Sequence, residues 1–134
     1  MSAVDTSVAI AAFATWHESH TAARSALSRG AWLIAHVALE TYAVLTRLPP
    51  PHRAPGELVV QFLVANFDKK WLGLSPQRHQ ALLESLTGAG IAGGAAYDAL
   101  VASTAAASGE TLLTLDRRAM RTYVAMGASV RLLT

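Results

Sequence analysis

The feature that most constrains this chain is an aspartate at the end of its first apolar segment. Asp5 follows Ala3-Val4, and Thr6-Ser7 separate it from a second apolar run. No Lys or Arg lies within a helical turn of it. A carboxylate in apolar surroundings is costly unless its charge is compensated. A metal ion, the backbone N–H groups of a helix start or a basic partner can do so, and the fold must bring one of them to Asp5.

Length and composition narrow the fold class. The chain has 134 residues, of which 52% are hydrophobic and only 15% are charged. This length predicts one domain, residues 1–134, and the apolar excess favours a sheet covered on both faces or a surface kept for a partner. The net charge of +2 says little about a nucleic-acid partner. The lack of cysteine excludes disulfides and thiolate metal sites.

The first residues resemble a signal peptide only superficially. An apolar run covers Ser7 to Ala14, but no basic residue precedes it and Asp5 interrupts it. No stretch approaches the ~20 apolar residues of a membrane span. We expect a soluble cytoplasmic protein that does not act at a membrane.

The pattern of apolar runs and turn residues alternates strands with helices. Strands are predicted at 3–5, 32–35, 71–74, 111–115 and 130–133. Helices are predicted at 8–15, 20–29, 37–48, 56–66, 76–87 and 96–108, with a last one opened by Arg117. Thr6 and Ser7 are candidate caps of the first helix. This order indicates an α/β fold with a parallel sheet.

Three further acids stand near the ends of these elements. Glu40 lies in the helix after the second strand, Asp98 lies in the first turn of a later helix, and Asp116 ends the strand that follows this helix. Taken alone, Glu40 reads as a solvated glutamate and Asp98 as an ordinary first-turn acid. Because sites in parallel sheets form at the carboxyl ends of strands, all three are expected to meet Asp5 at one edge.

Such a cluster points to divalent cations. Four carboxylates at close range raise one another's pKa unless cations separate them. Oxygen-only ligands suit Mg²⁺ or Mn²⁺. On phosphate esters these ions lower the pKa of a water molecule and stabilise the leaving oxygen. The acids therefore predict metal-dependent phosphoester chemistry.

The chain resembles the PIN-domain ribonucleases, and among them the VapC toxins of bacterial toxin–antitoxin pairs. The resemblance rests on four short motifs: Val4-Asp5-Thr6-Ser7, Ala38-Leu39-Glu40-Thr41, Tyr97-Asp98-Ala99-Leu100-Val101-Ala102 and Thr114-Leu115-Asp116-Arg117. It implies a PIN-like three-layer α/β/α domain with a central parallel sheet of four or five strands.

The resemblance also implies an activity and partners. Asp5, Glu40, Asp98 and Asp116 would be the catalytic acids around Mg²⁺ or Mn²⁺, with Asp5 and Asp98 as the principal ligands. The activity would be endonucleolytic cleavage of cellular RNA (tRNA, rRNA or mRNA) by metal-activated water. The partners would be a second copy of the chain and an inhibitory VapB antitoxin.

Hydroxyl residues near the acids also match the family. Thr6 and Ser7 stand beside the first acid and Thr114 near the last, where they would support the carboxylates by hydrogen bonding.

Two further groups of residues have alternative readings. Arg117, Arg118 and Arg121 are either solvated or contact RNA phosphates beside the acids. Phe13 and Trp16 are either core residues or part of a groove for the antitoxin.

Two rival functions remain open at this point. A phosphatase would use Asp5 as a covalent nucleophile, although Ser7 stands where a second acid is expected. A non-catalytic module would use the acids to bind arginines of a partner. The histidines show no metal-ligand spacing and are expected at the surface or at helix caps: His17, His20, His36, His52 and His79.

Overall fold

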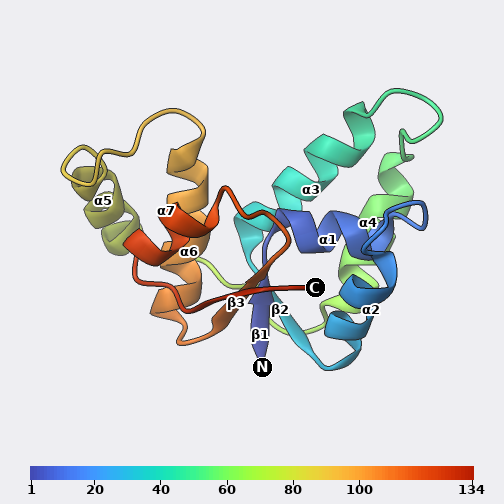
Figure 1. Ribbon diagram of the computed structural model, residues 1–134, viewed down its shortest axis with the longest axis horizontal. Helices are drawn as coiled ribbons and strands as arrows, with labels where there is room; N and C mark the ends of the chain where they lie inside the picture. Colours follow the sequence, from blue (N-terminus) through green and yellow to red (C-terminus); the bar gives the residue numbers. More distant parts are fainter.

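A four-stranded parallel sheet organises the computed structural model, which describes residues 1–134 (Figure 1). The spatial order of the strands is β2-β1-β3-β4. Their bounds are β1 Ser2–Val4, β2 Ala31–Leu33, β3 Thr111–Thr114 and β4 Val130–Leu132. The predicted α/β class and the parallel sheet of four or five strands are confirmed.

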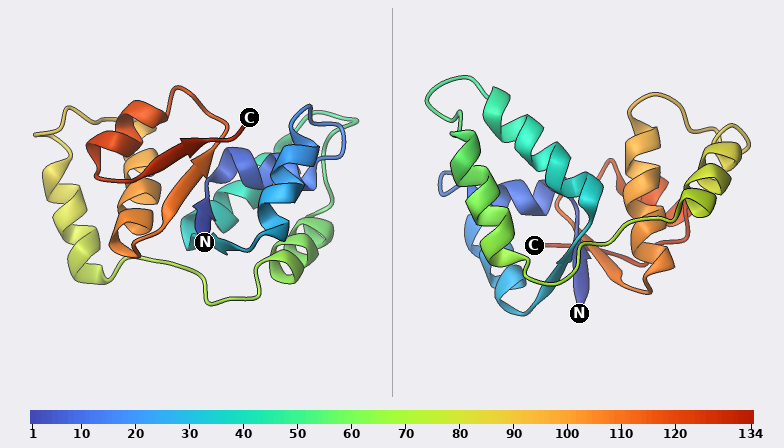
Figure 2. Two further views of the ribbon diagram at one scale, coloured as in Figure 1. Left: turned by 60° about the horizontal axis from the view of Figure 1, so that its bottom comes forward. Right: turned by 180° about the vertical axis from the view of Figure 1, so that it is seen from behind.

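Seven helices cover the sheet. Their bounds are α1 Thr6–Phe13, α2 His20–Ser28, α3 Ala35–Arg47, α4 Gly56–Asn66, α5 Pro76–Ser85, α6 Ala95–Ala107 and α7 Met120–Ala125. Helices α1 to α4 lie on one side of the sheet and α5 to α7 on the other, as Figures 1 and 2 show from different directions. None of these helices has the length and apolarity needed to cross a membrane.

The strands form because their side chains are apolar on both faces. Ala3, Val4, Leu112 and Leu113 in the two central strands are all buried. They belong to one cluster of 26 buried residues that extends into the helices of both layers. Runs that are apolar at every position are typical of parallel strands covered by helices on both sides. The apolar excess of the sequence is therefore largely used inside the fold.

The strand expected at 71–74 is wrong. Leu72 makes only an isolated bridge to Ile34, through hydrogen bonds of 2.8 Å from its N–H to Leu33 O and from Ala35 N–H to its carbonyl. Its neighbours Trp71 and Gly73 are exposed. The segment touches the edge of the sheet beside β2 and then leaves it, because only Leu72 packs against the core while its two neighbours face solvent.

The last helix also begins later than expected. It starts at Met120, because the Asp116 carboxylate accepts a hydrogen bond of 3.0 Å from Arg118 N–H and residues 117–119 form a turn. By contrast, Ser75 caps α5 as its pattern with Pro76 predicts, accepting a hydrogen bond of 3.1 Å from Arg78 N–H.

The strand order creates one crevice at the carboxyl edge of the sheet. From β1 the chain passes to β2 on one side, whereas β3 pairs with β1 on the other. Crevices for ligands form at the carboxyl ends of strands where the order reverses in this way. Asp5 immediately follows β1, and Thr114 is the last residue of β3.

The first prediction concerns the core of this sheet. Leu113→Ala on β3 should lower the free energy of unfolding by about 2 to 5 kcal/mol, because it removes a buried side chain and leaves a cavity. Urea denaturation measures this change. Leu83→Ala on α5, whose side chain is 67% exposed, is the control and should change it by less than about 0.5 kcal/mol. Equal effects of the two substitutions would contradict the assignment of Leu113 to the core.

Candidate active site

A cavity of about 250 Å³ opens where β1 and β3 end. All four acids singled out from the sequence line it, and no Lys or Arg does. The lining residues are Asp5, Thr6, Ser7, Ile10, Glu40, Val44, Asp98, Asp116 and Tyr123. The fold thus brings together carboxylates from the end of β1, from α3, from α6 and from the segment after β3.

Asp5 is buried, with only 2% of its surface exposed, and four hydrogen bonds compensate its charge. Oδ1 accepts from Ser7 Oγ at 2.5 Å and from Val8 N–H at 3.2 Å. Oδ2 accepts from the Thr114 hydroxyl and from the Tyr123 hydroxyl at 2.8 Å. Two carboxylate oxygens offer about four lone-pair positions, so these donors occupy the group fully.

Asp5 itself caps α1, which corrects the expectation that Thr6 and Ser7 do so. The Ser7 hydroxyl donates to Asp5 and accepts a hydrogen bond of 2.9 Å from Leu115 N–H. The Thr114 hydroxyl likewise donates to Asp5 and accepts a hydrogen bond of 2.9 Å from Asp116 N–H. These two hydroxyls therefore join the first acid to the segment that carries the last one.

The pKa of Asp5 follows from these surroundings. Burial raises it above the ordinary value of 3.8, and the hydrogen bonds from Ser7, Thr114, Tyr123 and Val8 act in the opposite direction. Donors to a carboxylate favour its charged form. Burial is the larger effect, so the pKa of Asp5 stays raised although the four bonds oppose the shift.

Glu40 is held by a hydroxyl from the start of α1. The Thr6 hydroxyl donates a hydrogen bond to Glu40 Oε1 on α3. Thr6 was expected to support the carboxylates, and the acid that it supports is Glu40 rather than its neighbour Asp5. Because α1 and α3 pack against each other, this bond orients Glu40 toward the cavity.

Asp98 reports the electrostatics of the cavity. Its pKa is raised from 3.8 to about 6, first by partial burial and then by the negative charges of Asp116, Glu40 and Asp5. The positive contribution of His36 opposes this shift. Like charges raise the pKa of an acid, so the four carboxylates act on one another across the cavity.

The donor chemistry of the cavity fits Mg²⁺ or Mn²⁺. Its charged groups are all carboxylates, which are hard oxygen ligands that such ions prefer. Burial and then the negative charges of the other acids raise the pKa of Asp98 to about 6, and a cation bound among them would act in the opposite direction. No three acid or histidine side chains are grouped tightly enough to hold an ion in the observed geometry. The metal-ligand roles of the four acids therefore stay predictions.

Tyr123 is the residue of the cavity that the sequence analysis missed. It lies on α7, is buried, and donates its hydroxyl to Asp5. Burial and then the charge of Asp5 raise its pKa, so the hydroxyl stays protonated and remains a donor. A tyrosine buried on the apolar face of a helix needs a hydrogen-bond partner for its hydroxyl, and this need could have identified Tyr123 from the sequence.

The arginines and the apolar pair lie outside the cavity. Arg117, Arg118 and Arg121 are exposed, form no ion pair, and only Arg121 belongs to α7. Phe13 packs edge-to-face on Phe62, with ring centroids 5.4 Å apart, against the core. Trp16 is 49% exposed, and the centroid of its ring lies 4.2 Å from that of the His52 ring.

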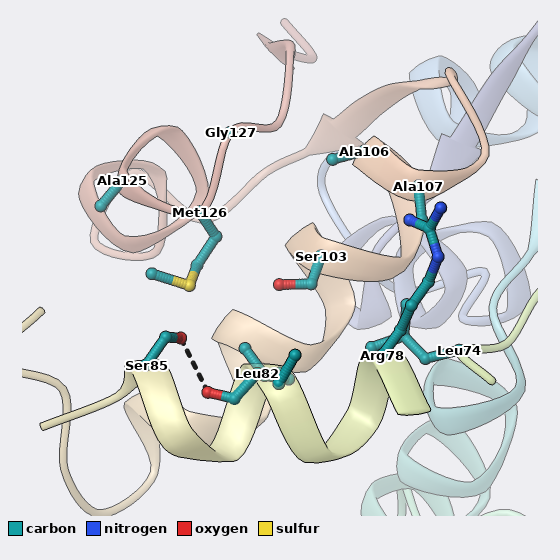
Figure 3. A pocket seen from close by; sticks show the side chains of 11 residues that line it. Leu74, Arg78, Leu82, Ser85, Ser103, Ala106, Ala107, Ala125, Met126 and Gly127 are labelled. Atoms are coloured by element: carbon teal, nitrogen blue, oxygen red, sulfur yellow. Dashed lines mark hydrogen bonds between the residues drawn. The ribbon is translucent and has the colours of Figure 1, made fainter. Parts of the chain in front are cut away.

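The largest cavity of the protein is elsewhere and has different chemistry. It measures about 640 Å³ and lies between α5, α6 and α7 (Figure 3). Arg78 is its only charged residue, and the Ser85 hydroxyl is already bonded to Leu82 O at 2.7 Å. The cavity's other hydroxyl, Ser103, has no acid or histidine beside it that could act as a base, so this cavity lacks the groups needed for catalysis.

The second prediction concerns Asp98 and pH. Because its folded pKa of about 6 lies above 3.8, its charged form costs stability, and that cost grows as the pH rises from 3.8 through 6. At pH values well above 6, Asp98→Asn should therefore raise the melting temperature of the metal-free protein. The difference from the unmodified protein should shrink as the pH falls toward 3.8. Thermal melts in EDTA across this range test it, and a pH-independent difference would contradict it.

The third prediction concerns Tyr123. Tyr123→Phe should lower the free energy of unfolding by about 1.5 to 3 kcal/mol, because it removes a buried hydrogen bond to a carboxylate and keeps the ring. Urea denaturation measures the loss. Tyr42→Phe on α3, where the side chain is 40% exposed, makes the same chemical change and should have an effect below about 0.5 kcal/mol. A loss no larger at Tyr123 would mean that its hydroxyl does not stabilise Asp5.

Comparison with known proteins places this chain in a family. Residues 3–125 match the PIN domain family. The chain is 50% identical over 134 residues to Ribonuclease VapC40 of Mycobacterium tuberculosis, covering 100% of both chains. It is 41% identical over 129 residues to Ribonuclease VapC27 of the same organism, covering 96% of this chain and 93% of the relative. With a full-length match and a four-stranded parallel sheet, the chain belongs to the PIN domain family, in its VapC branch.

Proposed function

We propose that this chain is a Mg²⁺- or Mn²⁺-dependent endoribonuclease, the toxin of a toxin–antitoxin pair. The observation that carries the proposal is the convergence of Asp5, Glu40, Asp98 and Asp116 on one cavity without a cation among them. The relatives at 50% and 41% identity are both named ribonucleases, which supports RNA as the substrate. The cellular compartment in this proposal is the cytoplasm.

The four acids take distinct roles in this proposal. Asp5 and Asp98 are the principal ligands, Glu40 binds directly or through water, and Asp116 completes the set. When bound, the ion supplies the positive charge that activates a water molecule and stabilises the leaving oxygen of the phosphodiester. At neutral pH, Asp98 is mostly ionised because its pKa is about 6. No other residue is therefore needed to remove its proton before the carboxylate binds an ion.

The surrounding residues keep the ligands in place. Ser7, Thr114 and Tyr123 hold Asp5 from three different elements, and Thr6 holds Glu40. Hydrogen bonds to a ligating carboxylate orient it and tune its affinity for the ion. Since all four lone-pair positions of the Asp5 carboxylate already accept hydrogen bonds, ion binding at Asp5 would require one hydroxyl to turn away.

The rival functions are less well supported. A covalent nucleophile must reach its phosphate, whereas Asp5 is buried and both its oxygens accept hydrogen bonds. A non-catalytic module is disfavoured by full-length similarity to proteins named ribonucleases. The exposed arginines after Asp116 remain candidates for phosphate contacts at the rim: Arg117, Arg118 and Arg121.

The proposed partners are a second copy of the chain and a VapB antitoxin. Phe13 and Trp16 are our sequence-based candidates for the antitoxin groove, and the exposed Trp16 is the more accessible of the two. A second apolar groove of about 290 Å³ lies between α3 and α4 and includes the exposed side chains of Leu39, Val64 and Trp71. An apolar segment of the antitoxin can cover either surface.

The fourth prediction tests the nuclease. The purified protein should cut total cellular RNA into discrete fragments with Mn²⁺ and should not cut it in EDTA. Asp98→Asn should lower the rate by a factor of at least about 100, because a misplaced ion no longer orients water and phosphate. Gel analysis and end-mapping of the fragments measure both effects.

The matched control is Asp68→Asn, which makes the same change at an exposed aspartate outside the cavity and should leave cleavage unchanged. Equal activity of the unmodified protein and Asp98→Asn would refute the site. Mn²⁺ binding measured by calorimetry should be weaker but still saturable in Asp98→Asn, because Asp5, Glu40 and Asp116 remain in the cavity, and it should be unchanged in Asp68→Asn.

A further inference from the structure

A large aromatic side chain stands exposed next to one of the acids of the carboxylate cavity. Tyr97 directly precedes Asp98 in the first turn of α6, and 57% of its side chain is exposed. Its ring stacks on the imidazole of His36, with centroids 5.3 Å apart and planes within 5° of parallel. His36 lies on α3, one helical turn before Glu40.

The stacked pair is held without the hydrogen bonds that histidine usually makes. His36 Nε2 is buried and has no partner. The expectation of a surface or capping residue is therefore wrong for His36, because its ring serves as a packing surface for Tyr97. One face of the tyrosine ring is thereby fixed against a second ring that belongs to the same site, while much of the side chain still faces solvent.

The cavity itself offers little affinity for an RNA chain. Its charged residues are all carboxylates, and these repel the phosphate backbone until an ion is bound. Affinity and the choice of cleavage site must therefore come in part from contacts with bases. Proteins that bind unpaired RNA commonly stack its bases on exposed aromatic side chains.

The space beside Tyr97 has the chemistry that a base needs. A cavity of about 220 Å³ between α5 and α6 is lined by Tyr97 and by apolar side chains, with His79 as its single polar residue. Because Tyr97 and Asp98 are adjacent in the chain, their Cα atoms are about 3.8 Å apart. The ring of Tyr97 also stacks on His36, whose positive charge acts on Asp98, so the ring lies on the side of α6 that carries the acid and a nucleotide whose phosphate is at Asp98 is within about one nucleotide of it.

We propose that Tyr97, backed by His36, is the stacking platform for the nucleobase that flanks the scissile phosphate, and that it helps to select the cleavage site. This inference rests on the RNA substrate proposed above. It assigns Tyr97 to substrate recognition and assigns His36 to positioning the tyrosine ring.

The experiment measures RNA binding in a chain that does not cut. The full chain carrying Asp98→Asn is titrated in Mn²⁺ against a fluorescein-labelled RNA oligonucleotide that spans the mapped cleavage site, or oligo(A), oligo(C) and oligo(U) if none is mapped. Adding Tyr97→Ala should weaken binding by about 5- to 150-fold, the range found for loss of one base–aromatic stack. Tyr97→Trp should keep the affinity within a few-fold, and the control Tyr42→Ala should leave it unchanged.

A second arm identifies the base. The oligonucleotide is made with one abasic position at a time. For the chain with Tyr97, removal of one particular base should cost as much affinity as Tyr97→Ala does. With Tyr97→Ala already present, the same abasic substitution should have no further effect. This coupling is expected only if that base and that ring are in contact.

Three results would overturn the inference. The first is that removing a base costs the same affinity with and without Tyr97. The second is that the chain does not bind the RNA. The third is that Tyr97→Ala changes the mass of the protein measured by light scattering, which would make Tyr97 a contact between subunits. Cleavage without base coupling defeats the platform and leaves the nuclease intact. If instead the loss of one base and the loss of the Tyr97 ring are coupled but the unmodified protein does not cleave RNA, the stacking platform stands and the proposed nuclease activity is refuted.

Discussion

The buried carboxylate of Asp5 is the group on which the rest of the structure depends. Without a cation nearby, its burial is tolerable only because four donors surround it: Ser7, Val8, Thr114 and Tyr123. These donors come from α1, β3 and α7, so one acid ties together three elements that are distant in the chain. The same bonds place Asp5 at the crevice where β1 and β3 end.

The other acids turn this structural anchor into a site. Glu40, Asp98 and Asp116 face the same small cavity, and their charges together with partial burial raise the pKa of Asp98 to about 6. The protein thus keeps a concentration of negative charge that a divalent ion would relieve. The larger cavity between α5, α6 and α7 has more room but no such charge, so chemistry rather than volume distinguishes the candidate site.

The regular elements were predictable where local pattern and burial agree. The strands at 3–5 and 111–115 were expected within a residue or two, because runs apolar on both faces fit only a sheet covered on both sides. The segment 71–74 has a similar pattern but makes only one bridge, since its pairing depends on a neighbouring edge. His36 and Tyr123 were missed because their partners are remote in sequence.

The sequence by itself determined that Asp5, Glu40 and Asp98 lack a local cation, and that these three acids and Asp116 stand near the ends of strands and helices. Those are properties of spacing and residue type, which are readable along the chain. Only the tertiary structure decided which hydroxyl supports which acid. Thr114 and Tyr123 are more than a hundred residues from Asp5, and Thr6 reaches Glu40 rather than its neighbour. Hydrogen bonds are set by the distance and direction between atoms, and for residues this far apart the fold alone supplies both.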